Sequence, residues 1–556
     1  MKKILLCSIF LVIIITGKAQ IPPWNWVESS LGAGSEVAHK SVTDHFGNVY
    51  LVGIFNKEAT FGNITLLNPD STNDIFIVKY SNNGDVVWAR SAGGNSYDIC
   101  NSICIDNNGD LIITGMYMSP SITFGSTVLT NNFPGTSDIF VVKYDQNGNV
   151  IWAKKYGGSV DEEALSICSD NSNNIYVCGN YSSTLLSFGT INLINTTSNG
   201  VCRDLFIVKL DSNGNTIWAK SAGGNANNFD EARHVAISNS GDVFIAGNYS
   251  GTTMSFGSVA LTSANSSKDI FLTKLNSSGT ALWARNTNGT SKGDLFGLTV
   301  DYYGNPIISG YYQDSTINFN GTILANPTFN HSYNPEMFLV KYDGNGNVLW
   351  GKSIGSNCSD MGGSVTTDNY GYVYALGSSF GEFIHIDNDS LYLGNPGSCS
   401  AFSIKLDPYG NYIWSYGSRH CMYVSSSINS NSEFFLTGNY NDTLTLGTSS
   451  LINTSISTNS DNFIAKMGNV TSISNASFKT ITEIYPNPSQ GIFSVKYKQG
   501  IKSVEILSVL GERISIIRPE TFCSDIEIDL SEAPKGIYLL KIDNGHNICV
   551  KKVVLN

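Results

Sequence analysis

The sequence predicts an all-β protein that consists of a long repeat array and a smaller C-terminal domain. Tryptophan recurs along most of the chain at spacings of 62 to 67 residues. Charged residues make up only 14% of the 556 residues and Gly contributes 54, whereas an average soluble protein has about 25% charged residues. The hydrophobic content of 41% is ample for a packed core and excludes wholesale disorder.

The first 19 residues have the layout of a secretory signal peptide. Lys2 and Lys3 precede an apolar run over residues 4–16, and Gly17-Lys18-Ala19 supplies the small residues of a cleavage site. That run is shorter than the about 20 residues of a membrane-spanning helix, and no other segment reaches 18 apolar residues. We therefore expect cleavage after Ala19, export, and no transmembrane span in the mature protein.

The acidic balance argues against a nucleic-acid partner. The formal net charge is −12, and proteins that bind nucleic acid do so largely by neutralising phosphates with Lys and Arg.

Seven copies of one unit occupy residues 20–468. The first copy predicts four strands, over residues 41–44, 49–54, 74–80 and 86–90, joined in part by short Asn- and Gly-rich turns that are typical of hairpins. Four-stranded units repeated in this way predict a seven-bladed β-propeller. Three landmarks recur in each copy: a Trp, a Gly in the second strand, and a Phe three residues before a Lys. The tryptophans are Trp26, Trp88, Trp152, Trp218, Trp283, Trp350 and Trp414.

The two ends of the array complement each other. The last unit lacks a Trp-bearing fourth strand, whereas an extra strand of this kind lies at residues 24–29. Trp26 precedes Gly53 by 27 residues, the same spacing as between Trp88 and Gly115. We therefore expect the N-terminal strand to complete the seventh blade, which closes the ring and covers edges that would otherwise pair with other chains.

The repeat, for example residues 138–154 with the sequence DIFVVKYDQNGNVIWAK, resembles the SBBP repeats of bacterial seven-bladed propellers. This resemblance extends over about residues 24–468. It implies a fold and no particular reaction.

The C-terminal part differs in charge pattern and lacks the Trp repeat. After a linker at residues 469–482, five strand-like runs within residues 483–556 predict a small Ig-like β-sandwich. The segments IYPNP (484–488), VLG (509–511) and GIYLLK (536–541), followed by Lys551-Lys552, resemble the type A C-terminal sorting domain of the type IX secretion system. The resemblance implies that the type IX machinery is a partner through residues 483–556. It also implies that the protein is secreted or reaches the outer cell surface. The alternative is an ordinary Ig-like adhesion module.

Acidic residues recur where the chain returns from the outer strand of one unit to the inner strand of the next. A ring of such carboxylates at the channel mouth could hold a hard cation such as Ca²⁺. Alternatively, each acid caps its own turn or pairs with a Lys of its blade, and recurrence in most units favours this structural role. We therefore predict no cofactor, with Ca²⁺ as the alternative. The acids are Glu36, Asp98, Glu162, Asp230 and Asp360, together with Asp294 one place off the pattern.

No catalytic set emerges from the sequence. It contains no Gly-x-Ser-x-Gly elbow and no phosphate-binding loop, and its histidines are scattered. We therefore predict that the protein is not an enzyme.

Length variation points to one face of the propeller. The Phe-to-Trp hairpin has 12 residues in each complete copy, whereas the Gly-to-Phe segment runs from 23 to 28. The variable links emerge on the face opposite the constant hairpins, and loop variation of this kind marks a recognition surface. The longest link carries His331 and Tyr333, near Tyr311 and Tyr312, and such aromatic side chains can stack on a sugar or a peptide.

Together these features predict an exported, noncatalytic β-propeller with a binding or adhesion role, whose ligand is a glycan, a protein or a matrix component. The alternatives are a secreted hydrolase that acts on polysaccharide and a structural component of the cell surface.

Overall fold

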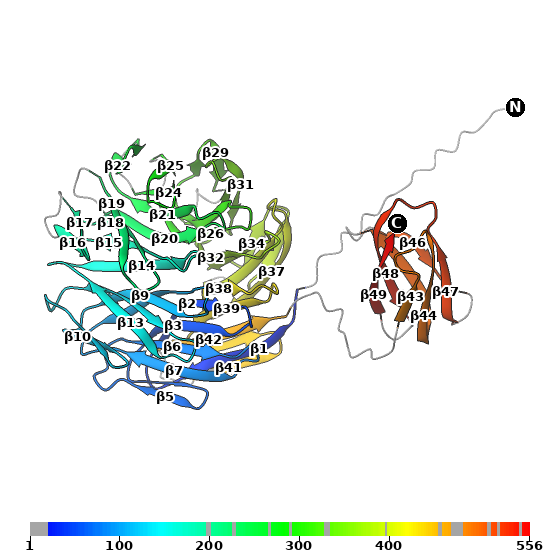
Figure 1. Ribbon diagram of the computed structural model, residues 1–556, viewed down its shortest axis with the longest axis horizontal. Coiled ribbons are helices and arrows are strands. Elements are labelled where there is room, and N and C mark those ends of the chain that lie inside the picture. The colour runs from blue at the N-terminus through cyan, green and yellow to red at the C-terminus, as the bar shows by residue number, and fades with distance from the viewer. Residues whose placement is uncertain are drawn as a thin grey trace. The chain divides into compact units, whose positions relative to one another are not determined.

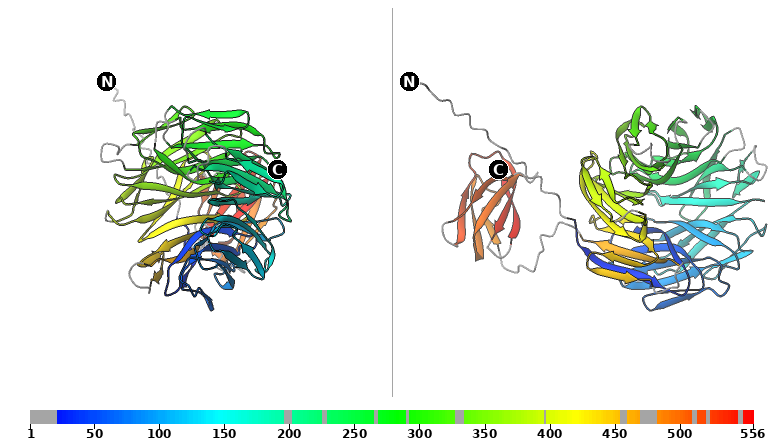
Figure 2. Two further views of the ribbon diagram at one scale, coloured as in Figure 1. Left: turned by 90° about the vertical axis from the view of Figure 1, so that its left-hand side faces the viewer. Right: turned by 180° about the vertical axis from the view of Figure 1, so that it is seen from behind.

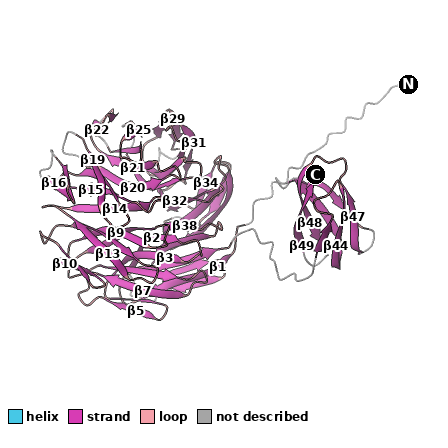
Figure 3. Cartoon of the chain, viewed as in Figure 1, coloured by secondary structure: helices cyan, strands magenta, loops and turns pink. Residues whose placement is uncertain are grey.

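The computed structural model describes residues 21–195, 202–224, 229–264, 268–288, 292–326, 334–394, 397–453, 459–468, 482–508, 513–519, 523–543 and 548–556. The chain divides into two compact units, Met1–Gly468 and Asn469–Asn556. All regular elements in the described ranges are β-strands (Figure 3), which confirms the all-β prediction. The predicted signal peptide at residues 1–19 and the linker up to residue 481 lie outside the described residues.

In the described residues of the larger unit, seven sheets each contain four long antiparallel strands (Figure 1), and in six of them these strands come from one stretch of the chain, with a short hairpin between the second and the third. We number these sheets 1 to 7 and call their first strands inner and their fourth strands outer. Sheet 1 contains β2 (Glu36–Thr43), β3 (Val49–Phe55), β6 (Asp74–Tyr80) and β7 (Val86–Ala92). Sheet 2 contains β8 (Asp98–Ile105), β9 (Leu111–Tyr117), β12 (Asp138–Tyr144) and β13 (Val150–Tyr156), and sheet 3 contains β14 (Glu162–Ser169), β15 (Ile175–Tyr181), β18 (Asp204–Leu210) and β19 (Thr216–Ala222). Sheet 4 contains β20 (Glu231–Ile237), β21 (Val243–Tyr249), β24 (Asp269–Leu275) and β25 (Ala281–Asn286), and sheet 5 contains β26 (Gly293–Val300), β27 (Pro306–Tyr312), β30 (Glu336–Tyr342) and β31 (Val348–Ile354). Sheet 6 contains β32 (Asp360–Thr367), β33 (Val373–Ser379), β36 (Ser400–Leu406) and β37 (Tyr412–Arg419).

Sheet 7 joins the two ends of the larger unit. Its strands β38 (Cys421–Ile428), β39 (Phe434–Tyr440) and β42 (Asp461–Met467) come from the end of the array, and its fourth strand is β1 (Trp24–Leu31). Val27 of β1 lies opposite Ala465 of β42, and Ser29 lies opposite Phe463. The blue N-terminal strand therefore lies beside the yellow-orange end of the array (Figures 1 and 2). This is the pairing that the sequence predicts for residues 24–29.

The inner strands form a continuous series. Each inner strand contacts the next, from β2 through β8, β14, β20, β26 and β32 to β38, and β38 in turn contacts β2. Hydrogen bonds between neighbouring sheets accompany these contacts, for example from the amide of Ser41 to Oγ of Ser425 at 3.1 Å. The inner strands therefore surround a common channel.

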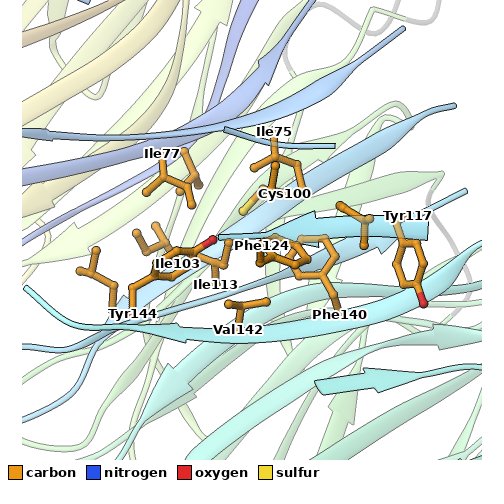
Figure 4. Packing of buried hydrophobic residues seen from close by; sticks show 14 of the residues in the cluster. Ile75, Ile77, Cys100, Ile103, Ile113, Tyr117, Phe124, Phe140, Val142 and Tyr144 are labelled. Carbon is orange, nitrogen blue, oxygen red and sulfur yellow. The ribbon is translucent and has the colours of Figure 1, made fainter. Parts of the chain in front are cut away.

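The recurring tryptophans connect one sheet to the next. The indole N–H of Trp88 on β7 donates to the carbonyl of Gln146, 3.1 Å away in the turn before the outer strand of sheet 2. Gly148 in that turn has φ +78°, and a Cβ there would lie 3.1 Å from the Trp88 ring, so Gly suits both the backbone and the indole. Figure 4 shows the apolar cluster between sheets 1 and 2, in which Ile75 and Ile77 pack near Cys100 and Ile113. The indole bond recurs at Trp26, Trp152, Trp218, Trp283 and Trp350.

A short hairpin interrupts the link between the second and third strands of each sheet. The first hairpin also pairs with β1, where Ser30 lies opposite Phe61, and other hairpins approach the outer strand of the preceding sheet. The hairpins are β4 (Glu58–Phe61) with β5 (Ile64–Leu67), β10 (Ser121–Phe124) with β11 (Thr127–Thr130), β16 (Leu185–Phe188) with β17 (Ile191–Ile194), β22 (Thr253–Phe256) with β23 (Val259–Thr262), β28 (Thr316–Phe319) with β29 (Thr322–Ala325), β34 (Phe383–Ile386) with β35 (Asp389–Tyr392), and β40 (Thr443–Leu446) with β41 (Ser449–Ile452).

The smaller unit contains two antiparallel sheets that share a core, with Val495, Ile506, Ile528 and Leu540 fully buried. One sheet consists of β43 (Thr482–Tyr485), β44 (Ile492–Ile501) and β47 (Cys523–Asp529). The other consists of β46 (Arg513–Ile517), β45 (Ser503–Ser508), β48 (Gly536–Asp543) and β49 (Ile548–Leu555). In the described part of the chain, we find no helix with the length and apolar character needed to cross a membrane.

Candidate functional site

A β-bulge at the same place in every inner strand directs side chains toward the channel. In β2 the register shifts between Ala38 and Lys40, so His39 is the extra residue, and bulges commonly re-aim a side chain. Six of the seven bulged residues line a cavity of about 520 Å³, which we call the mouth. Each bulged residue lies 14 positions before the Gly of the second strand. They are His39, Asn101, Leu165, Arg233, Phe296, Gly363 and Val424.

The bulged position therefore does not repeat, although the strands around it do. The position two residues earlier also varies and carries an acid on three consecutive inner strands: Glu163, Glu231 and Asp294. The corresponding residues of the other sheets are apolar, namely Val37, Ile99, Met361 and Met422. The mouth thus departs from the repeat chiefly at sheets 3 to 5.

Ion pairs link the acidic side chains of sheets 4 and 5. Nη2 of Arg233 lies 3.1 Å from Oε2 of Glu231 and 3.4 Å from Oδ1 of Asp294. Nζ of Lys268 lies 2.7 Å from the same Asp294 oxygen, and Arg203 reaches Glu231 at 3.9 Å. These acids and cations therefore hold one another in place at the mouth.

Glu163 has a different environment. Its carboxylate accepts a hydrogen bond of 3.0 Å from the amide of Asn101, and burial raises its pKa. Glu163 therefore takes up a proton more readily than an exposed glutamate.

Aromatic rings adjoin the charged groups. The guanidinium of Arg233 lies 5.7 Å from the centre of the Phe296 ring, and Tyr311 stacks with Phe296 at 5.8 Å between ring centres. Phe296 is nevertheless 36% exposed, and Phe229, beneath the guanidinium of Arg203, is 48% exposed. We call Arg203, Glu231, Arg233, Asp294, Phe296 and Tyr311 the mouth cluster.

The structure separates the aromatic residues that the sequence predicts as ligand-binding. Tyr311 belongs to the mouth cluster, whereas Tyr312 is fully buried and its hydroxyl lies 2.7 Å from Oγ of Ser353. The two differ because successive side chains of a strand point to opposite faces. His331 and Tyr333 lie outside the described residues.

Five of the six predicted channel-mouth carboxylates lie elsewhere, and Asp294 alone reaches the mouth cluster. The five are buried, and backbone amides of their own links donate to several of them, for example Gly158 to Glu162 at 2.7 Å and Gly224 to Asp230 at 2.9 Å. They point away from the channel because they lie one residue before the channel-facing position of Asp294. The buried set is Glu36, Asp98, Glu162, Asp230 and Asp360.

Each of these buried acids lies close to a second acid, at the start of the third strand of the preceding sheet. Glu36 and Asp461 form such a pair between sheets 1 and 7, where burial and the neighbouring Asp461 raise the pKa of Glu36 to about 8. A Cβ on Gly93 would lie 2.0 Å from the Asp74 carboxyl, so the Gly-rich links allow this close packing. The other pairs are Asp74 with Asp98, Asp138 with Glu162, Asp204 with Asp230, and Glu336 with Asp360.

The described ranges contain no group of three or more His, Cys, Asp and Glu side chains that could hold a metal ion. The absence of a cofactor, with Ca²⁺ as the alternative, therefore stays a prediction.

Comparison with known proteins identifies the smaller unit. Residues 483–556 match the family model of the secretion system C-terminal sorting domain. The predicted sorting domain is confirmed. A sorting domain of this family directs the protein through the type IX secretion system, so the protein is exported and is either secreted or located on the outer cell surface.

The repeat array is similar to proteins of larger size. A WD repeat-containing protein, L264 of Acanthamoeba polyphaga mimivirus, is 24% identical over 403 residues, which are 61% of this chain and 29% of that protein. The chain spans less than a third of the length of the curated relatives that it matches.

Solved structures that are similar to this chain include the Dos1 propeller, with a TM-score of 0.31 and 12% identity over 82% of this chain and 92% of that one. YCF48 bound to a D1 peptide has a TM-score of 0.37 and 10% identity, and the match covers 81% of this chain and 100% of that one. An ulvan lyase of polysaccharide lyase family 25 has a TM-score of 0.39 and 11% identity, with 75% and 93% covered. At TM-scores below 0.5 these likenesses imply nothing about the activity or the ligand of this chain.

The prediction that the protein is not an enzyme is wrong. The similar propellers include that polysaccharide lyase and a gluconolactonase of Xanthomonas campestris, with TM-scores of 0.39 and 0.30. The lack of a familiar catalytic motif in the sequence is therefore no ground for excluding an activity.

Proposed function

We propose that the protein is an exported seven-bladed β-propeller of the SBBP repeat type that binds a glycan at the mouth of its central channel. Its sorting domain, with an Ig-like β-sandwich fold, carries it through the type IX machinery. The observation that carries the proposal is that the channel-facing positions of the inner strands break the repeat at sheets 3 to 5.

The chemistry of the mouth cluster suits a sugar. Carboxylates of Glu231 and Asp294 accept hydrogen bonds and Arg233 donates them, so neighbouring hydroxyls can be bound in both directions. The exposed edge of Phe296 offers an apolar surface beside these groups. The mouth cavity of about 520 Å³ also lies within the usual 300–1,000 Å³ of small-molecule sites.

We expect Arg233→Met to weaken glycan binding by at least about tenfold, as removal of a central interface Arg commonly does. The full mature chain is screened against a glycan array, and affinity for the best ligand is measured by calorimetry. Arg233 is partly exposed and lies at the cavity, so the variant is expected to melt like the parent.

Arg285→Met is the matched control. Arg285 also lies over an aromatic ring, 5.4 Å from that of Trp283, but its guanidinium binds the Gly346 carbonyl at 3.1 Å, in a turn of the next sheet. It is expected to leave the affinity unchanged. Equal affinity of Arg233→Met and the parent, or no glycan bound at all, would contradict the proposal.

A further inference from the structure

The junction between sheets 6 and 7 carries neither of the two buried acids found at most junctions. At the five junctions with an acid pair, one acid lies at the inner strand and the other starts the third strand of the preceding sheet. Cys421 and Ser400 occupy these two places here. The link into the inner strand is also the shortest of the seven, because β37 ends at Arg419 and β38 begins at Cys421. This junction is therefore built differently from the rest.

A second cysteine lies beside Cys421. At each junction with an acid pair, the amide of the inner-strand acid donates to the carbonyl of the residue just before the third strand, for example Asp98 to Asn73 at 3.0 Å. In sheet 6 the residue before the third strand is Cys399. Its carbonyl accepts a hydrogen bond of 3.1 Å from the amide of His420, which directly precedes Cys421. The two cysteines thus occupy a pair of positions that the fold brings together at the other junctions.

The distances at this junction suit a covalent bond between the two side chains. Sγ of Cys399 lies 3.9 Å from the carbonyl oxygen of Cys421. Cα atoms of a hydrogen-bonded antiparallel pair are about 5.5 Å apart, and those of a disulfide are about 4.4–6.8 Å apart. His420 has φ +58°, so the regular alternation of side chains is interrupted just before Cys421. Sγ of Cys421 lies 3.7 Å from the Ser418 carbonyl, and rotation about the Cα–Cβ bond can turn it toward Cys399.

Both cysteines line a cavity of about 430 Å³. Cys399 is partly exposed, whereas Cys421 is buried, so an oxidant can reach Cys399 first. Burial raises the pKa of both thiols, which disfavours the thiolate that a catalytic cysteine needs. The pair is therefore suited to a structural bond rather than to catalysis.

We propose that Cys399 and Cys421 form a disulfide after export, which takes the place of a buried acid pair between sheets 6 and 7. Both residues have free thiols in the structure, and exported proteins enter oxidising surroundings in which disulfides persist. The bond would fix the inner strand of sheet 7, the sheet that joins the two chain ends, to sheet 6. This proposal does not depend on glycan binding at the mouth.

The oxidant is a disulfide-bearing thiol oxidant, for which oxidised glutathione serves as the probe. The Cys399 thiolate attacks the glutathione disulfide, which forms a mixed disulfide and releases one glutathione thiolate. The Cys421 thiolate then attacks the sulfur of Cys399 and releases the second glutathione thiolate. The two protein thiols are thereby oxidised, the glutathione disulfide is reduced, and the two thiol protons pass to the released thiolates.

Peptide mapping of the mature Cys358→Ser variant after treatment with oxidised glutathione tests the bond. Free thiols are blocked under denaturing conditions before digestion with trypsin, which cleaves after Lys405 and Arg419 and so separates the two cysteines. The substitution leaves Cys399 as the only cysteine between Lys352 and Lys405, which makes the assignment unambiguous. We expect mass spectrometry to find the peptides of residues 353–405 and 420–466 joined, and dithiothreitol to separate them.

Melting provides a second readout. The disulfide closes a loop of about 22 residues between positions 399 and 421, so the oxidised Cys358→Ser variant is expected to melt about 3 °C above its reduced form. Adding Cys399→Ser should remove both the joined peptides and this difference. The peptide map is read in a chain that retains both cysteines, so it stands even if the serine variant folds poorly. Free or glutathione-bound thiols at both positions after oxidation, or Cys421 joined to another cysteine, would overturn the proposal.

Discussion

A chain that lacks residues 21–31 is expected to lose the cooperative melting of its larger unit. These residues contain β1, which pairs with β42 on one side and with β4 on the other. The indole of Trp26 donates to the Asn82 carbonyl at 2.9 Å, so the strand also joins sheet 7 to sheet 1. Deletion of a core-packing Trp alone costs about 3–5 kcal/mol, and this deletion also leaves β42 with an unpaired edge.

Calorimetric melting of the mature chain, with and without residues 21–31, measures this effect. Trp218→Ala is the comparison, because Trp218 makes the same bond to Ser277 inside the array, at 3.1 Å, without joining the chain ends. We expect the deletion to be far more damaging than this substitution. A truncated chain that melts like the parent would show that β1 does not complete sheet 7.

A rise in pH from 5 to 8.5 is expected to destabilise the larger unit. Burial raises the pKa of Glu336 to about 8 and that of Asp230 to about 7, above their ordinary values near 4, and the other buried acid pairs are shifted in the same direction. At pH values between the ordinary pKa and the raised pKa of each acid, the folded state holds more protons than the unfolded state, so the free energy of unfolding falls as pH rises. The stabilisation is complete below about pH 4 and is lost as pH passes through 6 to 8.

The size of this effect follows from the number of pairs. One unit of pKa shift corresponds to about 1.4 kcal/mol, and five pairs are involved. We expect a loss of several kcal/mol, which in a unit of this size lowers the melting temperature by about 5–10 °C.

Substitutions at the acid pairs identify the source of the pH dependence. Glu36→Gln combined with Glu336→Gln should reduce the dependence without abolishing it, because Gln does not titrate and two of the five pairs are changed. Glu382→Gln, at an exposed acid, should leave it unchanged. A melting temperature that is constant or increases from pH 5 to 8.5 in the parent would contradict the assignment.

The repeated parts of this fold were predictable because each copy meets the same physical demand. Every Trp in the hydrogen-bonded set packs against the turn that precedes the outer strand of the next sheet. Each of these turns needs a Gly or another residue that tolerates its backbone conformation. The same residue types therefore recur at regular spacings in the sequence. The N-terminal strand was predictable for the same reason, because Trp26 and its spacing to Gly53 follow the pattern of the array.

The mouth was harder to predict because its residues are the ones that do not repeat. The acids that recur, such as Glu36 and Asp98, face the junctions between sheets. The next residue along each inner strand faces the channel instead, and Asp294 occupies that position in its strand. The β-bulge inserts one extra residue into each inner strand, so the alternation of side chains along the strand no longer predicts which residues face the channel. The bulge brings Arg233 and Phe296 to the channel. Aligning the units on the Gly of the second strand reveals both variable positions, but only the structure shows that they face one cavity.

The most direct test of ring closure is a disulfide between the two chain ends, formed in the Val27→Cys/Ala465→Cys variant. These residues lie opposite each other in β1 and β42, and opposite Cα atoms of antiparallel strands lie about 4.5–5.5 Å apart, within the range of a disulfide. We expect mild oxidation of the folded protein to join the peptides that contain residues 27 and 465, as detected by mass spectrometry. Two thiols that stay free, or that pair with other cysteines instead, would contradict a ring closed by β1.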